Sequence, residues 1–250
     1  MKDIAVYSFL VGDYDGFNDL DPAIMEPEID YYFFTNNRNI VSKYYTIVYI
    51  DVEDSVLETY HFHGHRIPDI IRAYKYSIFY DANAYLTRKI SGIISELDPE
   101  VEFLSFMFPI PFTVKRYFIK QEVYGGKSLY IDKYNQYIAD GWKDDKYFSN
   151  TKVMVRRHTP RLFAFSDFWF KEMRGQNDEF ALYYCAWKHN LNMRILYPFH
   201  ILRYFIIQYH KNSKSGGGNN TDMYYHVMYG CQKLLHGYDY IKSFWYNLFR

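Results

Sequence analysis

The sequence has few cysteines and no excess of either charge. Only Cys185 and Cys231 are cysteines among 250 residues, which excludes a disulfide framework and a thiolate metal cluster. Basic and acidic residues number 29 each, so the formal net charge is +0. Nucleic-acid-binding proteins usually carry a basic excess, so we expect no nucleic-acid partner.

Long apolar runs are also missing. No stretch approaches the ~20 apolar residues that a membrane-spanning helix needs. The first residues, MKDIAVYSFLVGDYDG, contain a short apolar run that stops at Gly12 and Asp13. They lack the longer apolar region and the small-residue cleavage site of a signal peptide. We therefore expect a soluble, cytoplasmic protein without a membrane span.

Aromatic residues, in contrast, are abundant. They make up 22% of the chain, with 29 Tyr and 21 Phe, and 250 residues suffice for one substantial core. Many of the tyrosines must be half-buried, with the ring packed and the hydroxyl near water. The composition therefore predicts one large, aromatic-rich domain.

Apolar runs with β-forming residues alternate with segments of helical spacing. We expect strands over 4–11, 30–37, 44–51, 102–108, 151–158 and 193–198, and a strand that runs into a loop over 77–86. We expect helices over 66–77, 87–98, 160–174 and 178–190, and a helix pair within 115–140. This alternation predicts an α/β fold with a mostly parallel central sheet flanked by helices. The domain spans 1–210, followed by a flexible Gly-rich loop at 211–221 and an aromatic, helical C-terminal tail at 222–250 that packs on the same domain.

Polar residues follow several of the predicted strands. In parallel sheets ligands bind outside the carboxyl ends of the strands, where residues 13–15, 36–37 and 81–83 are expected. Asp81 and Asn83 are two positions apart, so they project to the same side. Their oxygen atoms suit Mn²⁺ or Mg²⁺ bound to a diphosphate. The other interpretation is a strand-ending turn in which both side chains cap the backbone.

A group of three histidines, His61, His63 and His65, precedes the helix predicted at 66–77. Alternating histidines on a strand can bind a transition metal. No acid or cysteine completes an obvious ligand shell here. The sequence therefore favours a polar loop over a metal site.

Basic residues occur at two places from which they can contact a diphosphate. Arg72 and Lys75 lie on the predicted helix that leads to Asp81, where they either neutralise phosphate or form a solvated helix face. His210, Lys211 and Lys214 precede the Gly-rich run and can close over a metal–diphosphate group.

An imidazole is a suitable third metal ligand beside Asp81 and Asn83. His210 is the candidate, because it stands at the border of the flexible, basic loop. His200 is its rival, since it follows the strand predicted at 193–198 directly.

The order of these segments resembles a family long catalogued without a function and related to family 8 glycosyltransferases, which have a GT-A core. IAVYSFLVGDYDGF is similar to the family's opening strand and Gly-x-Tyr-Asp loop, and YYFFTNN to its Phe-Thr-Asp strand, with Asn36 where Asp is usual. RIPDIIRAYKYSIFYDANAYL resembles the segment that leads to the metal corner. VMVRRHT, FWFKEM and NDEFALYYCAWKHNL resemble the downstream half, although Asn177 and Glu179 replace the family's Arg and Gln.

The resemblance implies a GT-A-like transferase that uses a UDP- or GDP-linked sugar, Mn²⁺ or Mg²⁺, and a glycan or other hydroxyl acceptor. It implies that Asp81 and Asn83 are metal ligands and that Tyr14, Asp15 and Asn36 contact the base and ribose. Placement in the sequence adds His210 as third metal ligand and the following phosphate contacts: Arg72, Lys75, Lys211 and Lys214. Asp178 is the candidate catalytic residue, as a base, a nucleophile or a group that positions a hydroxyl. The other interpretation of Asp178 is an N-cap of the helix that it opens.

Two other functions remain open from the sequence. A catalytically inactive sugar- or nucleotide-binding module is favoured by the departures at Asn36, Asn177 and Glu179. A nucleotidyltransferase would use a similar metal corner, but it usually needs a Gly-rich loop with Arg or Lys after the first strand. The acidic segment DYDGFNDLD argues against it.

Overall fold

A seven-stranded sheet forms the centre of the protein in the computed structural model, which describes residues 2–12, 15–52, 55–108, 113–116, 129–147, 149–174, 178–207 and 230–235. The strand order is β3-β2-β1-β4-β7-β6-β8. The strands are β1 (Ile4–Leu10), β2 (Ile29–Thr35), β3 (Thr46–Tyr49), β4 (Tyr76–Asp81), β6 (Phe103–Met107), β7 (Ser149–Arg157) and β8 (Met193–Leu196). All run parallel except β7, which is antiparallel to both of its neighbours, β4 and β6. The predicted α/β fold with a mostly parallel sheet is therefore confirmed.

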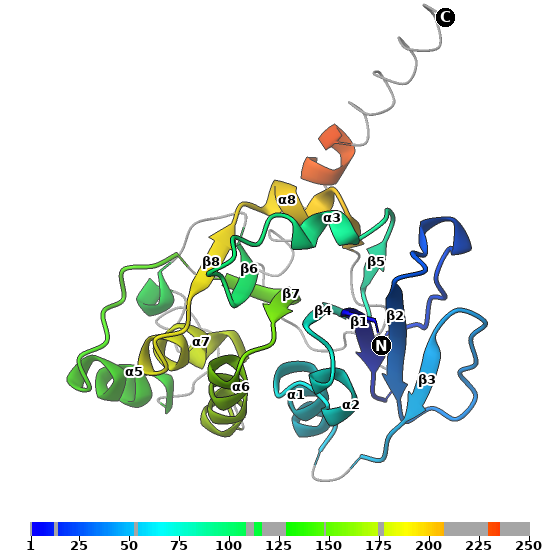
Figure 1. The fold of residues 1–250 in the computed structure, drawn as a ribbon. Helices are drawn as coiled ribbons and strands as arrows, with labels where there is room; N and C mark the ends of the chain where they lie inside the picture. Colours follow the sequence, from blue (N-terminus) through cyan, green and yellow to red (C-terminus); the bar gives the residue numbers. More distant parts are fainter. Residues whose placement is uncertain are drawn as a thin grey trace, which may run out of the picture.

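Helices cover both faces of this sheet (Figure 1). One face carries α1 (Val56–His65), α2 (Asp69–Arg72), α5 (Leu129–Ala139), α6 (Pro160–Glu172) and α7 (Asp178–Lys188). On the other side lie α3 (Ser91–Ile94), α8 (Pro198–Leu202) and a small antiparallel pair, β5 (Ala84–Leu86) with β9 (Phe205–Ile207). A 3₁₀ turn, η1 (Pro22–Ile24), precedes β2.

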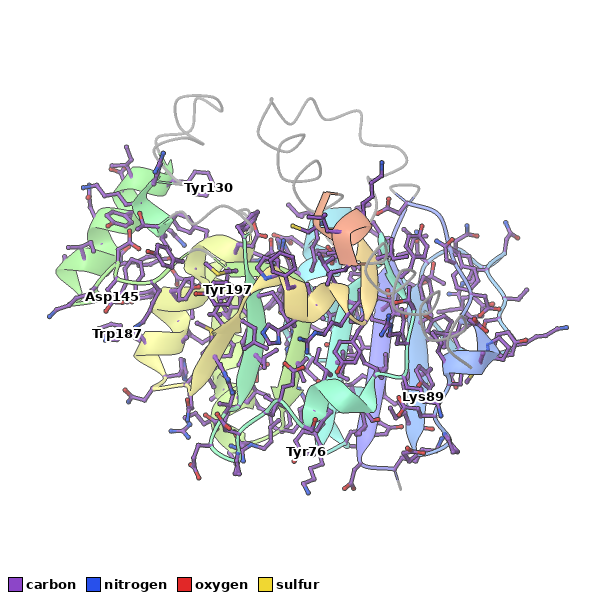
Figure 2. All side chains as sticks on the ribbon, turned by 90° about the horizontal axis from the view of Figure 1, so that it is seen from above. Tyr76, Lys89, Tyr130, Asp145, Trp187 and Tyr197 are labelled. Atoms are coloured by element: carbon purple, nitrogen blue, oxygen red, sulfur yellow. The ribbon has the colours of Figure 1, made fainter. Side chains whose placement is uncertain are left out.

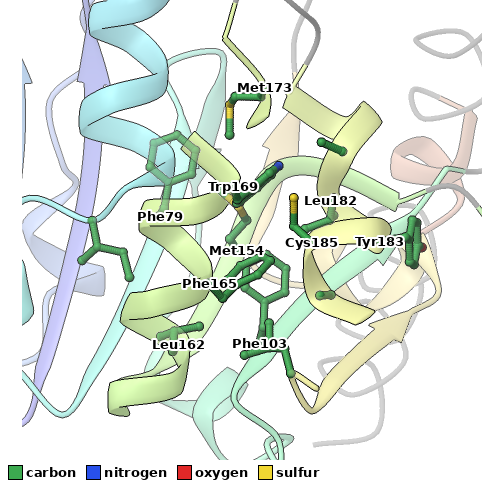
Figure 3. Packing of buried hydrophobic residues seen from close by; sticks show 14 of the residues in the cluster. Phe79, Phe103, Met154, Leu162, Phe165, Trp169, Met173, Leu182, Tyr183 and Cys185 are labelled. Atoms are coloured by element: carbon green, nitrogen blue, oxygen red, sulfur yellow. The ribbon is translucent and has the colours of Figure 1, made fainter. Parts of the chain in front are cut away.

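The two faces of the sheet form two separate apolar clusters. On the face of α6 and α7, strand residues such as Phe79, Phe103 and Met154 pack against Phe165 and Trp169 of α6 (Figure 3). β1 is buried along nearly its whole length because both of its faces are covered. This is why its sequence, IAVYSFL, is continuously apolar rather than alternating.

The core also contains a buried cation, Arg156 of β7, which is 0% exposed. Its guanidinium donates hydrogen bonds to the hydroxyl of Tyr7 at 2.6 Å and to the carbonyl of Gly64 at 3.0 Å. These bonds join β7 to β1 and to α1, so they fix the position of α1 on the sheet. They compensate in part for the loss of hydration of the charge.

The prediction of a helix over 66–77 is wrong, and so is the prediction of a polar loop for the three histidines. The chain instead forms α1 at 56–65, and only the four residues of α2 are helical in the predicted range. Ser55 caps α1 by accepting a hydrogen bond from the backbone N–H of Glu58 at 3.1 Å. Ile67, with φ of 67°, ends the helical path before Pro68. The histidines therefore lie on a helix, with His61 and His65 buried.

Other predicted elements are present with shifted bounds or lie outside the described residues. The helix predicted over 87–98 is reduced to α3. Of the pair predicted within 115–140, α5 is described, and of the other helix only residues 114–116 are described, which are helical. The predicted loop at 211–221 lies outside the described residues, and the tail is described only at 230–235. That segment is helical, and the amide of Gln232 donates to the carbonyl of Ile207 at 3.2 Å. Within the described part of the chain, no helix has the length and apolar character needed to cross a bilayer.

Candidate functional site

The strand order reverses between β1 and β4, and this is the point at which open α/β sheets form a ligand crevice. Asp81 is the last residue of β4 and pairs in register with Phe9 near the end of β1. Because β7 is antiparallel, its first residues lie at this same edge, and Val153 pairs with Tyr80. Asp81 and Lys152 are therefore neighbours at the carboxyl edge of the parallel strands.

Asp81 has a partner on each carboxylate oxygen. The hydroxyl of Tyr60 on α1 donates to Oδ1 at 2.5 Å, and the Nζ of Lys152 lies 3.3 Å from Oδ2. The side chains of Asp81 and Lys152 are only 12% and 15% exposed. Burial and the charges of Asp81 and Asp178 raise the pKa of Tyr60 well above its ordinary value. The Tyr60 hydroxyl therefore keeps its proton and remains a donor to Asp81.

The side chain of Asp178, the first residue of α7, contacts residues of two other elements. Its Oδ2 lies 2.8 Å from the Nε2 of His65 and accepts a hydrogen bond from the hydroxyl of Thr151 at 2.5 Å. Burial alone would raise the pKa of the Asp178 carboxyl. The electrostatic interactions with His65 and His61 and the hydrogen bonds from His65 and Thr151 outweigh burial, so that the pKa of Asp178 lies below its usual value. Asp178 is thus an ionised carboxylate held by α1 and β7, which is more than a helix cap requires.

Glu179, the next residue, has the opposite electrostatic environment. Burial and the charge of Asp178 raise its pKa well above the ordinary value, and the charge of Asp81 adds to this effect. Lys152 opposes the shift without cancelling it. Two adjacent carboxyl groups with pKa values pushed apart can act as a proton donor and a proton acceptor.

Asn83 lies two residues beyond the end of β4 and is 2% exposed. Asp81 and Asn83 are of the donor type that Mn²⁺ and Mg²⁺ prefer, since both offer oxygen atoms. The ammonium group of Lys152 already places a positive charge beside Oδ2 of Asp81. Among the described residues, no three His, Cys, Asp or Glu side chains form a metal-binding group. The described residues therefore offer one carboxylate and one amide at this turn, and a divalent cation here would need its other ligands from a bound anion.

Two of the three predicted contacts to base and ribose, Asn36 and Asp15, lie at the same edge. Asn36 follows β2, and its Oδ1 accepts a hydrogen bond from the backbone N–H of Gly12 at 2.9 Å. Gly12 has φ of +71°, a conformation that glycine adopts without strain. Asn36 therefore stabilises the turn after β1. Burial raises the pKa of Tyr85 on β5, and the charge of the half-buried Asp15 adds to this effect, so the two residues are close.

A cavity opens on the other face of the sheet, next to the Asp81–Asn83 turn. Ala82, the residue between these two, belongs to its wall. The rest of the wall consists of polar, aromatic and aliphatic residues: Ser8, Asn18, Asp19, Leu20, Phe33, Tyr45, Tyr80, Ala84, Tyr85 and Leu86. Its aromatic side chains come from β2, β4, β5 and the segment before β3. The cavity and the acidic residues thus flank the same turn.

The structure does not bring Arg72 and Lys75 to this site. They precede Tyr76, the first residue of β4, and Figure 2 shows Tyr76 at the end of the sheet away from Tyr197. A strand of 6 residues carries the chain roughly 17 Å before it reaches Asp81. The guanidinium of Arg72 donates to the carbonyl of Arg66 at 2.8 Å and to Asp167 at 2.6 Å. Their predicted phosphate contacts are therefore corrected: Arg72 has a structural role at the opposite edge.

Several predicted residues lie outside the described part of the chain: Tyr14, His210, Lys211 and Lys214. His200 is described, and its Nδ1 lies 2.9 Å from a carboxylate oxygen of Glu96. Its imidazole therefore already has a carboxylate partner in the layer of α3 and α8.

Five residues that contact or influence the carboxylates have no role at this site in the sequence-based predictions: Tyr60, His65, Thr151, Lys152 and Glu179. Tyr60 and His65 follow a capping-box signal, Ser55 with Glu58, which marks the start of α1. No sequence signal indicates that Thr151 and Lys152 lie at this edge, because this depends on the direction of β7. No protein-family model matches the chain, and no curated protein matches it.

Proposed function

We propose that the protein is a GT-A-like glycosyltransferase that moves a sugar from a UDP- or GDP-linked donor to a hydroxyl group of a glycan or similar acceptor. One observation carries the proposal: the carboxyl groups of Asp81, Asp178 and Glu179 converge at the switch point of a mostly parallel sheet. Ligands of doubly wound sheets bind at this position. Perturbed carboxyl groups there are typical of catalytic sites.

In this proposal, Asp81 and Asn83 face the diphosphate of the donor. They are the residues that would hold Mn²⁺ or Mg²⁺, which when bound would stabilise the negative charge on the departing nucleoside diphosphate. Tyr60 orients the Asp81 carboxylate through its hydrogen bond of 2.5 Å. Asp15 and Asn36 would contact the nucleoside.

Asp178 acts at the reacting sugar. His65 and Thr151 fix one of its oxygens and keep the carboxylate ionised. An ionised carboxylate at this point can accept the proton of the acceptor hydroxyl, attack the sugar carbon or position the hydroxyl. Glu179 retains its proton and can donate a hydrogen bond to a substrate oxygen.

This arrangement favours an enzyme over an inactive binding module. A sugar-binding module needs hydrogen-bonding groups, but it has no need for two adjacent carboxyl groups with pKa values driven in opposite directions. The His65–Asp178 contact joins α1 to α7 across 113 positions of sequence, so it fixes the carboxylate to two separate elements. Such rigid placement of a charged group is what a catalytic site requires.

The test is a thermal-shift and calorimetric screen of UDP- and GDP-sugars with and without Mn²⁺, followed by measurement of released nucleoside diphosphate. We expect binding that depends on Asp81 and slow hydrolysis or transfer that depends on Asp178. Asp140→Asn is a matched control for Asp81→Asn, because Asp140 also contacts a tyrosine and a lysine, Tyr184 and Lys188. Binding without turnover would identify an inactive module, and absence of all binding would refute the proposal.

A further inference from the structure

Lys152 is a cationic side chain that no predicted role includes, and it lies among the acidic groups of the site. Its Nζ is 3.3 Å from Oδ2 of Asp81, and its charge influences Glu179. The backbone of Lys152 belongs to β7, whose following residues Val153, Met154 and Val155 are fully buried. The strand is therefore fixed, while the four-carbon side chain can rotate about its own bonds.

The ammonium group lies at Oδ2, the carboxylate oxygen of Asp81 that Tyr60 does not contact. A divalent cation at Oδ2 would have a positive charge a few ångströms away, and the two would repel each other. Tyr60 already uses Oδ1. In the described part of the chain, no cluster of three ligating side chains exists to offset this repulsion. A divalent cation alone should therefore bind weakly.

A diphosphate changes this balance in two ways. Its oxygens supply additional ligands for a divalent cation, and they accept charge-assisted hydrogen bonds from an ammonium group. Lys152 can then turn from Asp81 to a phosphate oxygen without losing an ionic partner. Asp81 becomes available to the metal at the moment when the metal's other ligands arrive.

We propose that Lys152 holds the cation position at Asp81 until a diphosphate binds, and then contacts the phosphate. The proposal rests on the proposed function, since it takes a nucleoside diphosphate as the ligand. Its consequence is that the divalent cation and the diphosphate bind cooperatively, each raising the affinity for the other. The Asp81–Lys152 ion pair then keeps a divalent cation from binding Asp81 until the diphosphate is present.

The experiment compares the wild type with Lys152→Met, which removes the charge and keeps an unbranched side chain of similar length. Lys188→Met is the matched control, because Lys188 pairs with Asp140 at 3.1 Å at the other end of α7. Calorimetry, with electron paramagnetic resonance of free Mn²⁺, measures the binding of Mn²⁺ alone, of pyrophosphate in EDTA, and of UDP or GDP with Mn²⁺. Circular dichroism checks that each variant is folded.

We expect opposite effects of Lys152→Met on the two ligands. The affinity for Mn²⁺ alone should rise about tenfold or more, because the competing charge is gone. The affinity for pyrophosphate without metal should fall about tenfold, the effect of one charge-assisted hydrogen bond. Lys152→Arg should keep Mn²⁺ binding weak, since it retains the charge, and Lys188→Met should change neither affinity.

Two results would overturn the inference. Unchanged Mn²⁺ affinity in Lys152→Met would mean that the ammonium does not compete with the metal. A loss of affinity for both ligands would mean that Lys152 only positions Asp81. The pyrophosphate measurement separates this inference from the proposed function: pyrophosphate binding that depends on Lys152, without binding of UDP or GDP, would refute the nucleotide-sugar donor and leave the role of Lys152 intact.

Discussion

The Nε2 atom of His65 lies 2.8 Å from Oδ2 of Asp178, although 113 positions separate the two residues in the chain. His65 is the last residue of α1, and Asp178 is the first of α7, so the contact joins two helices at the edge of the sheet. Thr151 of β7 donates to the same oxygen. Three elements thus determine the position of one carboxylate.

The first prediction concerns Asp178→Asn. The amide retains hydrogen-bonding ability, so the loss of unfolding free energy should be modest, about 1 to 2 kcal/mol. It cannot carry the negative charge or accept a proton, so we expect turnover of the nucleotide sugar to fall about 100-fold or more. Release of nucleoside diphosphate and urea unfolding measure the two effects. Turnover equal to that of the wild type would reduce Asp178 to a structural residue.

The second prediction concerns the coupling between Asp81 and Lys152. Asp81→Asn removes the charge that Lys152 faces at 3.3 Å, and we expect a loss of about 1 to 3 kcal/mol in the free energy of unfolding. Lys152→Met alone should also destabilise the protein. The double variant should lose at least about 1 kcal/mol less than the sum of the two, as expected for residues in contact. Urea unfolding of the four proteins gives this value, and additive losses would contradict a direct interaction.

The third prediction tests the corrected role of Arg72. Its guanidinium contacts two backbone carbonyls, of Arg66 and Ile67, and the carboxylate of Asp167. Arg72→Ala should therefore lower the free energy of unfolding by about 2 to 3 kcal/mol. It should leave the affinity for UDP or GDP unchanged, because Arg72 lies at the opposite edge of the sheet. A specific loss of nucleotide affinity in a stable variant would restore the original phosphate role.

Much of the sheet could be predicted from the sequence because its strands are apolar runs bounded by turn residues. The run IAVYSFL and the segment that ends at Asp81 are examples, and parallel order then places Asp81 at the ligand edge. The position of Lys152 at the site could not be predicted, because the sequence pattern of a strand does not show its direction in the sheet. Since β7 is antiparallel, its first residues rather than its last lie at the edge of Asp81. Arg72 was misplaced for a related reason: it is near Asp81 in sequence, but β4 separates the two.

The prediction of a polar loop in place of α1 was wrong for a different reason. Its sequence, VLETYHFHGH, mixes apolar and polar residues and has no clear apolar stripe, so helical periodicity was hard to recognise. Burial of His61 and His65 follows from tertiary contacts with Asp178, Trp169 and the sheet, which local sequence does not show. The capping pair Ser55 and Glu58 was the available signal.

The last prediction concerns pH and His158, which follows β7. Its Nδ1 lies 2.7 Å from the carbonyl of Tyr74, which only accepts, so Nδ1 carries the proton of the neutral ring. Nε2 lies 2.8 Å from the hydroxyl of Ser77 and accepts from it. Burial, opposed by the hydrogen bond to Tyr74 and aided by the charge of Arg156, lowers the pKa of His158 from 6.5 to about 4.

The unfolded chain therefore binds this proton more readily than the folded protein does. The contribution of neutral His158 is fully present above about pH 6.5 and is lost as the pH falls towards 4. Between pH 7 and pH 5 we expect the wild type to lose about 1 to 2 kcal/mol more unfolding free energy than His158→Gln, which has no such proton to gain. Urea unfolding at both pH values measures the difference. His61, with a pKa also lowered to about 4 by burial, remains in both proteins and cancels in the comparison. Equal losses in the two proteins would show that His158 does not titrate in this range.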